Sequence, residues 1–328
     1  MDGVFIAMTV CGDKIAPLAS AAIRSIHRST QRHQYDATLF LLHDGVEATR
    51  RIISLWSEAR AASLTRLAVT DVLVNSSVPG AKLFRLCATV RLGLQRLLPQ
   101  VELAIYMDAD VIVQGDLREM VGLASTFNAT QWMALATEDG RWYTHARHIE
   151  LANSTQHGPF FGDSGLNTGI FLANLTRWRR SAFDAFGQTF LEKGYSAPLG
   201  DQDIVNAYYF EHPAEVFLLP CKWNQRTDST CSQQRHFAAD GIYHGSRQLF
   251  TRANSTVSFP APQVDHGSHR AAPWANALGP RYHTAPPPHN TPRDDRTART
   301  DLDEPDDLHQ KHIFQLLARV EGYPLDGE

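Results

Sequence analysis

The sequence lacks the features that mark nucleic-acid-binding and membrane-spanning proteins. Its 328 residues carry a formal net charge of −4, so there is no basic excess for a phosphate backbone, and no nucleic-acid partner is expected. No run of about 18 apolar residues occurs, so the sequence predicts no membrane span. It has no secretory signal peptide, and Met1 is followed almost directly by an apolar segment. Membrane attachment would therefore need an anchor that is absent from this sequence.

Cysteine is scarce, and its spacing gives no zinc site. The four cysteines stand at positions 11, 87, 221 and 231. Cys221 and Cys231 bracket a short, polar, turn-rich segment, which predicts a disulfide in an oxidising compartment, with two free thiols as the alternative. Cys11 and Cys87 lie in apolar contexts, so we expect them to be buried thiols.

Asparagine is also infrequent, yet half of it occurs in N-glycosylation sequons. Only ten asparagines are present, and five of them have Ser or Thr two positions later with no proline between. These five are Asn75, Asn128, Asn153, Asn174 and Asn254. The enrichment indicates a protein of the secretory pathway, in the Golgi or endoplasmic reticulum lumen. Chance in a sequence rich in Ser and Thr is the alternative.

The composition is otherwise that of a globular protein with one large or two medium domains, since 43% of residues are hydrophobic and 20% are charged. Up to about residue 250, apolar runs of strand length alternate with segments of helical periodicity. Strands are predicted at residues 4–10, 38–42, 64–69, 103–107, 111–113, 132–137, 170–173, 216–219 and 241–244, and helices at 17–29, 47–60, 82–98, 175–191 and within 199–210. The helix within 199–210 has an aspartate at its start as a candidate N-cap. This alternation predicts an α/β domain with a mostly parallel central sheet and helices on both faces.

The character of the sequence changes after residue 250. Pro, His, Thr and charged residues dominate 251–305, so we expect an irregular, disordered insertion there. Helical periodicity returns over 306–322, where an acidic start and Arg319 near the end agree with the helix dipole. The chain is therefore expected to consist of a domain at 1–250, the irregular segment, and a C-terminal helix that packs on the domain.

Two aspartates directly after a predicted strand give the strongest chemical signal. Residues 103–107 have the character of a buried strand, Asp108 and Asp110 follow, and a second apolar run occupies 111–113. Burying an ionised carboxylate without a partner is costly, and a divalent cation removes that cost because Mg²⁺ and Mn²⁺ accept carboxylate oxygens. Open α/β sheets also bind ligands at the carboxyl ends of their strands. A solvated turn that happens to contain two aspartates is the alternative.

Further polar clusters at strand ends and helix starts suit a site for a metal-bound nucleotide sugar. They are Asp163 with Asn167, Asp201 with Gln202, and His244 with Arg247. A neutral His244 would complete the ligand set of a cation, because imidazole suits Mn²⁺ better than Mg²⁺. Arg247 and Arg91 would neutralise diphosphate charge, and Asn167 and Asp201 would hydrogen-bond sugar hydroxyls. The alternatives are a core histidine at 244, a structural ion pair at Arg91 and a turn at Asn167.

The order of these motifs resembles glycosyltransferase family 8. The matching motifs are Arg91-Leu92, Tyr106-Met-Asp-Ala-Asp110, Asn167-Thr-Gly169, Asp201-Gln-Asp-Ile-Val-Asn206 and His244-Gly-Ser-Arg247, within residues 1–250. The segment Leu219-Pro-Cys-Lys-Trp-Asn-Gln-Arg226 and its continuation to Arg247 look most similar to the glucoside and xyloside xylosyltransferases of that family. The resemblance implies a GT-A fold with a Rossmann-like nucleotide-binding half, a UDP-sugar donor, Mn²⁺ or alternatively Mg²⁺, and transfer with retention of configuration. The implied reaction moves xylose from UDP-xylose to a glycan or glycoprotein acceptor, such as O-linked glucose or xylose.

The resemblance also implies roles for individual residues. Asp108, Asp110 and His244 become metal ligands. Gln202 and Asp201 become the catalytic residues, with Gln202 beside the anomeric carbon on the face opposite UDP. The residues implied to contact the UDP-sugar are Thr9, Cys11, Arg91, Asp108, Asp110, Asn167, Gly245 and Arg247. At position 247 many family members have lysine, and arginine keeps the cation that a diphosphate contact requires.

Several alternatives stay open at this point. In the first alternative the donor is UDP-glucose or UDP-galactose. In the second alternative the chain is a non-catalytic glycan-binding relative. The full metal-ligand set argues against the second, because unpaired buried carboxylates are poor structural choices. A turn role for Gln202 is also open. An amide is a weak nucleophile, so an amide at position 202 indicates front-face attack rather than double displacement. In front-face attack the departing phosphate oxygen takes the acceptor proton.

Overall fold

A computed structural model of the protein describes residues 3–12, 15–61, 65–74, 89–138, 159–193, 197, 199–226 and 240–245. These residues all belong to one compact unit, Met1–Val264. The segments 251–305 and 306–322, together with Cys87, Cys231 and Arg247, lie outside the described residues. The predictions made for them therefore stay predictions.

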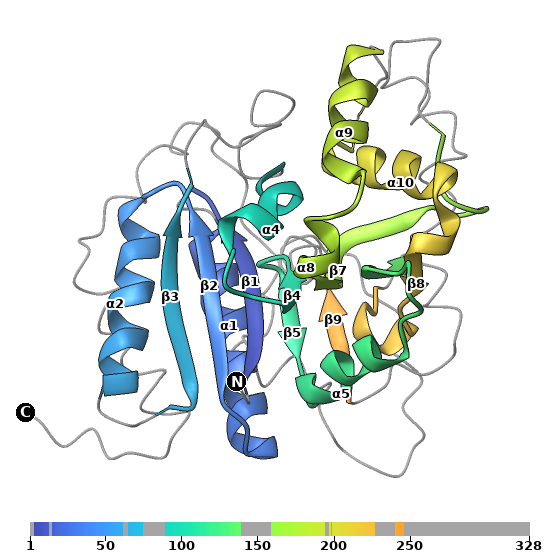
Figure 1. Ribbon diagram of the computed structural model, residues 1–328. Helices are drawn as coiled ribbons and strands as arrows, with labels where there is room; N and C mark the ends of the chain where they lie inside the picture. The colour runs from blue at the N-terminus through green and yellow to red at the C-terminus, as the bar shows by residue number, and fades with distance from the viewer. Residues whose placement is uncertain are drawn as a thin grey trace, which may run out of the picture. The chain divides into compact units, whose positions relative to one another are not determined.

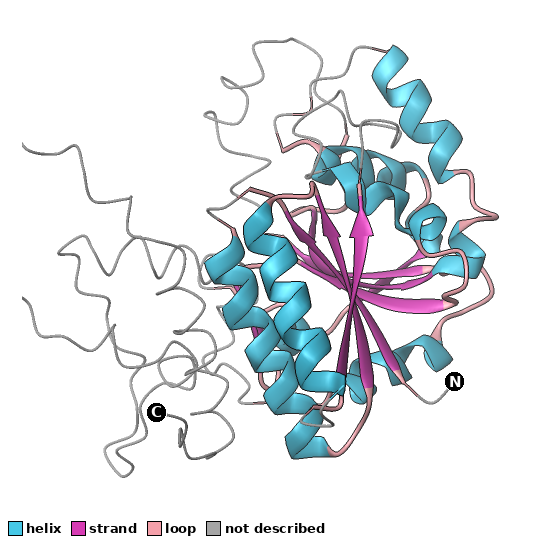
Figure 2. Ribbon diagram, turned by 90° about the vertical axis from the view of Figure 1, so that its left-hand side faces the viewer, coloured by secondary structure: helices cyan, strands magenta, loops and turns pink. Residues whose placement is uncertain are grey.

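The N-terminal part forms the parallel half of a seven-stranded sheet (Figure 1). It contains β1 (Val4–Val10), α1 (Ala16–His33), β2 (Ala37–His43), α2 (Glu47–Ala61) and β3 (Leu67–Leu73). The order β3-β2-β1 means that both crossovers step in the same direction, which places α1 and α2 on one face, where they contact each other. Figure 2 shows the twisted fan of strands with the helices packed against it. The predicted strands and helices of this half are confirmed, although β3 begins three residues later than expected.

The chain then returns across the sheet to β4 (Leu103–Met107), which pairs in parallel with β1. This connection includes the 3-10 helix η1 (Val90–Gly93) and the single turn α4 (Leu94–Leu97). A crossover in the reverse direction places these turns on the face opposite α1 and α2. The prediction of one regular helix over 82–98 is wrong at residues 90–93, where the backbone tightens. Arg91 lies in this turn, and buried acidic groups at the sheet edge hold its guanidinium.

The C-terminal half adds antiparallel pairings. β6 (Met133–Thr137), β7 (Leu166–Asn174) and β8 (Val216–Leu218) complete the order β3-β2-β1-β4-β7-β6-β8. Within this sheet only β7 pairs in the antiparallel sense, with β4 and β6, which confirms the predicted mostly parallel sheet. β5 (Val111–Val113) and β9 (Ile242–His244) form a separate antiparallel pair. The other elements are α5 (Leu117–Gly122), η2 (Leu123–Thr126), α8 (Leu175–Trp178), α9 (Phe183–Glu192), α10 (Asp201–Glu211), η3 (Pro213–Glu215) and η4 (Cys221–Trp223).

Three local predictions are wrong in this half. β7 begins at Leu166, so Asn167 lies inside a strand rather than before one. The helix predicted at 175–191 is divided into α8 and α9. Asp201 is the first residue of α10 and not its N-cap, because Gly200 occupies that position with a φ of 69°. At Asn167 and Asp201, side-chain partners from distant parts of the chain outweigh the local preference for a turn or a cap.

An aromatic cluster fixes the elements that carry the polar residues of interest. The ring centroid of Trp132 lies 5.1 Å from that of Trp178, 5.7 Å from Phe183 and 5.9 Å from Tyr208. Trp132 directly precedes β6, and the other rings come from α8, α9 and α10. Favourable aromatic geometry adds about 0.5–1.5 kcal/mol per pair to the burial of apolar area. The cluster therefore holds the helices firmly against β6 and β7.

Cys11 and Cys221 are both disulfide-bonded. For Cys221 this agrees with the predicted disulfide, whose other cysteine lies outside the described residues. For Cys11 the prediction of a buried thiol is wrong. Cys11 directly follows β1 and is only half-buried, so the apolar residues before it reflect the strand and not the surroundings of its own sulfur.

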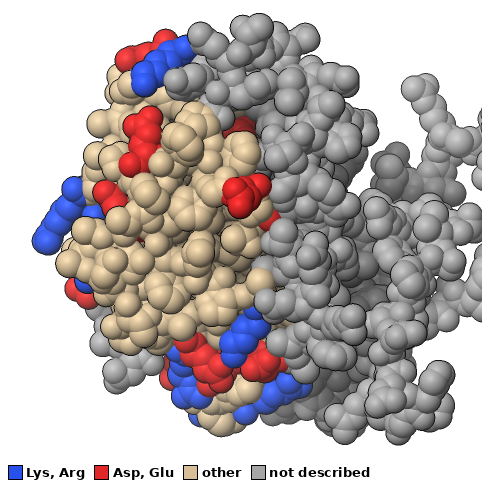
Figure 3. Space-filling view, turned by 90° about the vertical axis from the view of Figure 1, so that its right-hand side faces the viewer, with Lys and Arg blue, Asp and Glu red and all other residues tan. Residues whose placement is uncertain are grey.

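Among the residues that the structure describes, no helix is both long and apolar enough to cross a membrane. On the face drawn in Figure 3, charged side chains of both signs gather at the lower edge, and others are scattered over the rest of the face. Exposed ion pairs, such as Lys222 with Glu119 at 2.8 Å and with Asp240 at 3.1 Å, stabilise the fold little because water screens them.

Candidate active site

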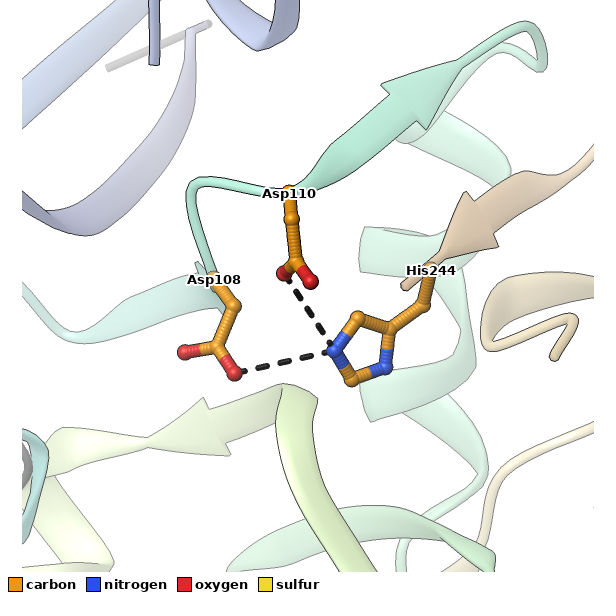
Figure 4. A group of neighbouring side chains, drawn as sticks. All are labelled: Asp108, Asp110 and His244. Atoms are coloured by element: carbon orange, nitrogen blue, oxygen red, sulfur yellow. Dashed lines mark ion pairs between the residues drawn. The ribbon is translucent and has the colours of Figure 1, made fainter. Parts of the chain in front are cut away.

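Asp108, Asp110 and His244 converge beside the carboxyl end of β4 (Figure 4). Asp108 follows β4, Asp110 precedes β5, and His244 ends β9. The pairing of β5 with β9 places Val111 opposite His244, which brings the imidazole next to Asp110. His244 Nε2 lies 3.6 Å from Asp108 Oδ2 and 3.6 Å from Asp110 Oδ1. The three side chains predicted as metal ligands are thus brought together from two distant parts of the chain.

Gly169 of β7 makes this convergence possible. A Cβ on Gly169 would lie 2.1 Å from His244 Cε1, 2.6 Å from His244 Nε2 and 2.9 Å from Asp108 Oδ2. The backbone N–H of Asp108 also donates to the Gly169 carbonyl at 2.7 Å, which ties the two strands at this point. Any larger residue at 169 would displace the imidazole, so glycine is required here for close approach and not for an unusual φ.

The group fits a divalent cation. Its three ligand atoms lie within 4.8 Å of one another, and an octahedral cation about 2.1 Å from each ligand separates ligand pairs by about 3 to 4.2 Å. Burial raises the pKa of Asp110. Burial also disfavours the ionised form of Asp108, but the Arg91 guanidinium together with His244 and the Tyr106 hydroxyl outweighs burial and lowers the pKa of that carboxyl. Two carboxylates and one imidazole offer the oxygen and nitrogen donors that Mn²⁺ accepts.

Arg91 is buried between two carboxylates. Its Nη1 lies 2.9 Å from Asp108 Oδ1, and its Nε lies 3.0 Å from Asp201 Oδ2. Nη1 also donates to the Thr168 carbonyl at 2.9 Å, and the guanidinium lies 4.8 Å above the centre of the Tyr106 ring. Burial raises the pKa of Asp201 to about 6, against the opposing effect of Arg91. Arg91 therefore makes the ion pair that was the structural alternative, and its diphosphate contact stays a prediction.

Gln202 is held by hydrogen bonds on both sides of its amide. Its Oε1 accepts from the Thr168 backbone N–H at 3.1 Å, and its Nε2 donates to Glu138 Oε2 at 3.2 Å. Glu138 is 2% exposed and also accepts from Arg226 Nη1 at 2.8 Å and from Asn167 Nδ2 at 2.6 Å. The structure thus brings Gln202 and Asn167 together, as the sequence predicts, around a carboxylate that the sequence reasoning missed.

Asn167 connects this group to His244. Its Oδ1 accepts from Asn224 Nδ2 at 2.9 Å, and Asn224 Oδ1 lies 2.9 Å from His244 Nδ1. The metal-ligand group and the Gln202 group are therefore parts of one continuous hydrogen-bonded site.

The family model for glycosyl transferase family 8 matches residues 7–241, which include Asp108, Asp110 and the Gln202 group and end three residues before His244. The chain belongs to this family. Human glucoside xylosyltransferase 1 is 29% identical over 285 residues, covering 77% of this chain and 61% of that protein. Mouse glucoside xylosyltransferase 2 is 32% identical over 200 residues, covering 52% of this chain and 43% of that protein. The chain thus spans about three fifths or less of the length of these family 8 relatives.

Two solved glycosyltransferase structures agree with the architecture. Mouse xyloside xylosyltransferase 1 in its apo form superposes with a TM-score of 0.54 at 19% identity, covering 75% of this chain and 98% of that one. The galactosyltransferase LgtC in complex with donor and acceptor sugar analogues gives a TM-score of 0.54 at 16% identity, covering 78% of this chain and 98% of that one. The predicted GT-A fold is confirmed.

The other family 8 positions predicted to contact the donor lie at the same edge of the sheet or outside the described residues. Thr9 is near the end of β1, and its Oγ1 lies 3.1 Å from the Tyr106 hydroxyl, which lies 3.1 Å from Asp108 Oδ1. Gly245 follows His244 with a φ of 83°. Cys11 is disulfide-bonded, and Arg247 is outside the described residues. Their contacts with a donor stay predictions.

Sequence reasoning missed Glu138 and Asn224, although the sequence contains a signal for each. Glu138 follows the predicted strand at 132–137, as Asp108 follows the strand at 103–107. Asn224 lies within the segment that resembles family 8 xylosyltransferases, and this resemblance is the signal that the sequence contains for it. The sequence rule that ligands bind at the carboxyl ends of strands would have identified Glu138.

Proposed function

We propose that the chain is a retaining, metal-dependent glycosyltransferase that moves xylose from UDP-xylose to a glycan. The convergence of Asp108, Asp110 and His244 in a family 8 chain is the observation that carries the proposal. The choice of xylose rests on relatives named glucoside xylosyltransferases, whose name also supplies the acceptor class. We accordingly propose a glycoside acceptor, such as O-linked glucose or xylose on a glycoprotein.

Mn²⁺ is the proposed cation, because a mixed set of two carboxylates and an imidazole suits it better than Mg²⁺. When bound, the cation would supply positive charge to the diphosphate of the leaving group. Arg91 and Tyr106 engage Asp108 Oδ1, which leaves Oδ2 as the oxygen that faces His244. The protein therefore orients Asp108 so that a defined oxygen is presented to the cation.

Front-face attack is the proposed route to retention. Asp201 is paired with Arg91, and Glu138 is paired with Arg226. Both carboxylates are thereby engaged within the protein, and the group beside them is the amide of Gln202. An amide is a poor nucleophile, but a fixed Oε1 is well placed to stabilise positive charge that develops at an anomeric carbon. In this route the acceptor hydroxyl gives its proton to the departing phosphate oxygen as the new glycosidic bond forms.

The direct test measures UDP release from a panel of UDP-xylose, UDP-glucose and UDP-galactose with a glucoside acceptor. We expect turnover that is highest with UDP-xylose, requires added Mn²⁺ and stops with EDTA. Nuclear magnetic resonance of the product should show the same anomeric configuration as the donor. Absence of turnover with all three donors, while Mn²⁺ and UDP still bind, would support a non-catalytic relative instead.

We also propose that the chain works in the lumen of the Golgi or endoplasmic reticulum. Disulfides at Cys11 and Cys221 require an oxidising environment. Among the described sequons, Asn128 is exposed, and its Oδ1 accepts from the backbone N–H and hydroxyl of Thr130 at 2.9 and 2.8 Å. Asn174 ends β7, where its Oδ1 caps α8 through the N–H of Arg177. Asn128 is therefore the described sequon with a side chain suited to carry a glycan.

A further inference from the structure

We propose that Asn224 is a positioning residue that holds His244 with the lone pair of Nε2 facing Asp108 and Asp110. The imidazole Nδ1 lies 2.9 Å from Asn224 Oδ1, while Nε2 lies 3.6 Å from each carboxylate. Asn224 is buried at 2% exposure, so no water competes freely for this contact. The inference rests on the proposed metal site, because a lone pair directed at two carboxylates is useful only when a cation lies between them.

The direction of the hydrogen bonds is set at Glu138, the far end of the chain of side chains. An ionised Glu138 only accepts, and its pairing with Arg226 at 2.8 Å supports the ionised state. Asn167 must therefore turn its Nδ2 toward Glu138, at 2.6 Å. Its Oδ1 then faces the opposite way and accepts from the Gly169 N–H at 3.0 Å and from Asn224 Nδ2 at 2.9 Å.

The same logic fixes the imidazole. With Nδ2 of Asn224 donated to Asn167, Oδ1 of Asn224 faces His244 and only accepts, so the proton of a neutral imidazole is at Nδ1. Nε2 is then unprotonated, as a metal ligand must be. A reversed Asn224 amide would place two acceptor oxygens of Asn224 and Asn167 about 2.9 Å apart in a buried site, which disfavours that orientation.

The backbone keeps Asn224 in place independently of its side chain. The N–H of Gln225 donates to Ile242 O at 2.9 Å, and the N–H of His244 donates to Gln225 O at 2.9 Å. These two bonds join the segment after η4 to β9, directly beside Asn224. Changing the side chain at 224 should therefore alter the hydrogen bond to His244 more than the path of the main chain.

The experiment measures Mn²⁺ affinity of the whole chain by isothermal titration calorimetry, with the metal alone. Asn224→Leu keeps a branched side chain of similar shape and removes the acceptor. Asn224→Ala also removes the acceptor and avoids the risk of overpacking. We expect both to weaken Mn²⁺ binding about 10–100-fold, the usual effect of losing a partner of a metal-bound histidine. Asn224→Asp keeps an acceptor at His244 but opposes Asn167 Oδ1, so it should lower the Tm while keeping near wild-type Mn²⁺ affinity.

Two controls separate positioning from general destabilisation. Gln95→Met removes another buried amide, which contacts Asp184 on α9, and should lower Tm without changing Mn²⁺ affinity. In a His244→Ala background, Asn224→Leu should have no further effect on Mn²⁺ binding, because its action passes through the imidazole.

The outcomes distinguish this inference from the proposed function. Wild type that binds Mn²⁺ while Asn224→Leu and Asn224→Ala bind it equally well overturns the positioning role and leaves the metal site standing. Wild type that binds no Mn²⁺ overturns both. Loss of affinity in Asn224→Asp as large as in Asn224→Leu also overturns the inference, because the acceptor at His244 is retained.

Discussion

Replacing Gly169 by alanine tests the close packing on which the metal-ligand group depends. The new Cβ would lie 2.1 Å from His244 Cε1, whereas ordinary contact begins near 3.4 Å, so the imidazole must retreat by about 1.3 Å. Metal–ligand distances tolerate changes of only about 0.2 Å, and a displacement of about 1 Å typically costs about 10²-fold in rate. We therefore expect Gly169→Ala to weaken Mn²⁺ binding by at least about 10-fold and to lower kcat/KM about 10²-fold.

The fold should survive this change. The atoms nearest to the new Cβ belong to the ends of the His244 and Asp108 side chains, which can move without moving the backbone. Gly169 also lies within β7, where alanine adopts the same extended backbone. The matched control is Gly187→Ala in α9, where the nearest atom to the new Cβ is Ile204 Cγ2 at 3.8 Å. In a helix interior this change should stabilise the protein by about 0.5–1 kcal/mol and leave Mn²⁺ binding unchanged.

Calorimetric titration with Mn²⁺, UDP release and Tm are measured on both variants and on His244→Ala. If Gly169 acts only through His244, adding Gly169→Ala to His244→Ala should cause little further loss of Mn²⁺ affinity. Wild-type Mn²⁺ affinity and turnover in Gly169→Ala would refute the reasoning, because they would show that His244 does not need its position beside residue 169.

Four other experiments have defined expected results. Asp110→Asn replaces an anionic ligand by a neutral one, so activity should fall to near background with little change in Tm, and full wild-type turnover in EDTA would contradict the metal site. Gln202→Ala should lower kcat about 10²-fold, the usual effect of losing one transition-state contact. Intact-protein mass spectrometry of Gln202→Glu incubated with donor alone should show no added sugar mass. A sugar adduct at residue 202 that turns over when acceptor is added would exclude front-face attack. Burial, reinforced by the charge of Arg28, lowers the pKa of His27 from 6.5 to about 4. Between these two pH values the unfolded chain binds a proton that the folded chain does not. The free energy of unfolding should therefore fall by about 2 kcal/mol from about pH 7 to pH 5 in wild type, and by less in His27→Gln. Expressed through a secretory pathway, the protein should carry a glycan that is lost in Asn128→Gln and kept in Asn174→Gln; peptide mapping that finds Asn174 occupied and Asn128 free would contradict this assignment.

Residues with a strong local signal were predictable from the sequence. Asp108 and Asp110 follow an apolar strand, and their type and spacing already indicate a cation. The order of strands and helices up to β3 is equally local, since apolar periodicity determines which faces are buried. These features were therefore predicted with only small errors in where elements begin and end.

Residues whose role depends on contacts across the fold were harder to predict. Gly169 matters because His244 approaches it from β9, far away in the sequence, and nothing near Gly169 in the sequence shows this. Asn224 is a further example, since its partners are Asn167 and His244. The 3-10 turn at Arg91 also arises from distant carboxylates, which outweigh a helical pattern in the surrounding residues.

Three consecutive residues of β7 join the metal-ligand group to Gln202. The Asn167 side chain reaches Asn224, and the space at Gly169 is filled by His244. The Thr168 hydroxyl lies instead 3.2 Å from Asp201 Oδ2. This division follows from the alternation of side chains in a strand, which places 167 and 169 on one face and 168 on the other.

The register of β7 therefore determines both halves of the site at once. Its pairing with β4 sets Met107 opposite Ile170 and Tyr106 opposite Phe171, so Asp108 is placed beside Gly169. A shift of one residue would turn the Thr168 side chain toward the imidazole and Asn167 away from it, which would remove the space for His244 and the hydrogen bond to Asn224 together. Buried apolar residues on both faces of β4 and β7 oppose such a shift. The packing of the hydrophobic sheet therefore determines the geometry of the polar site.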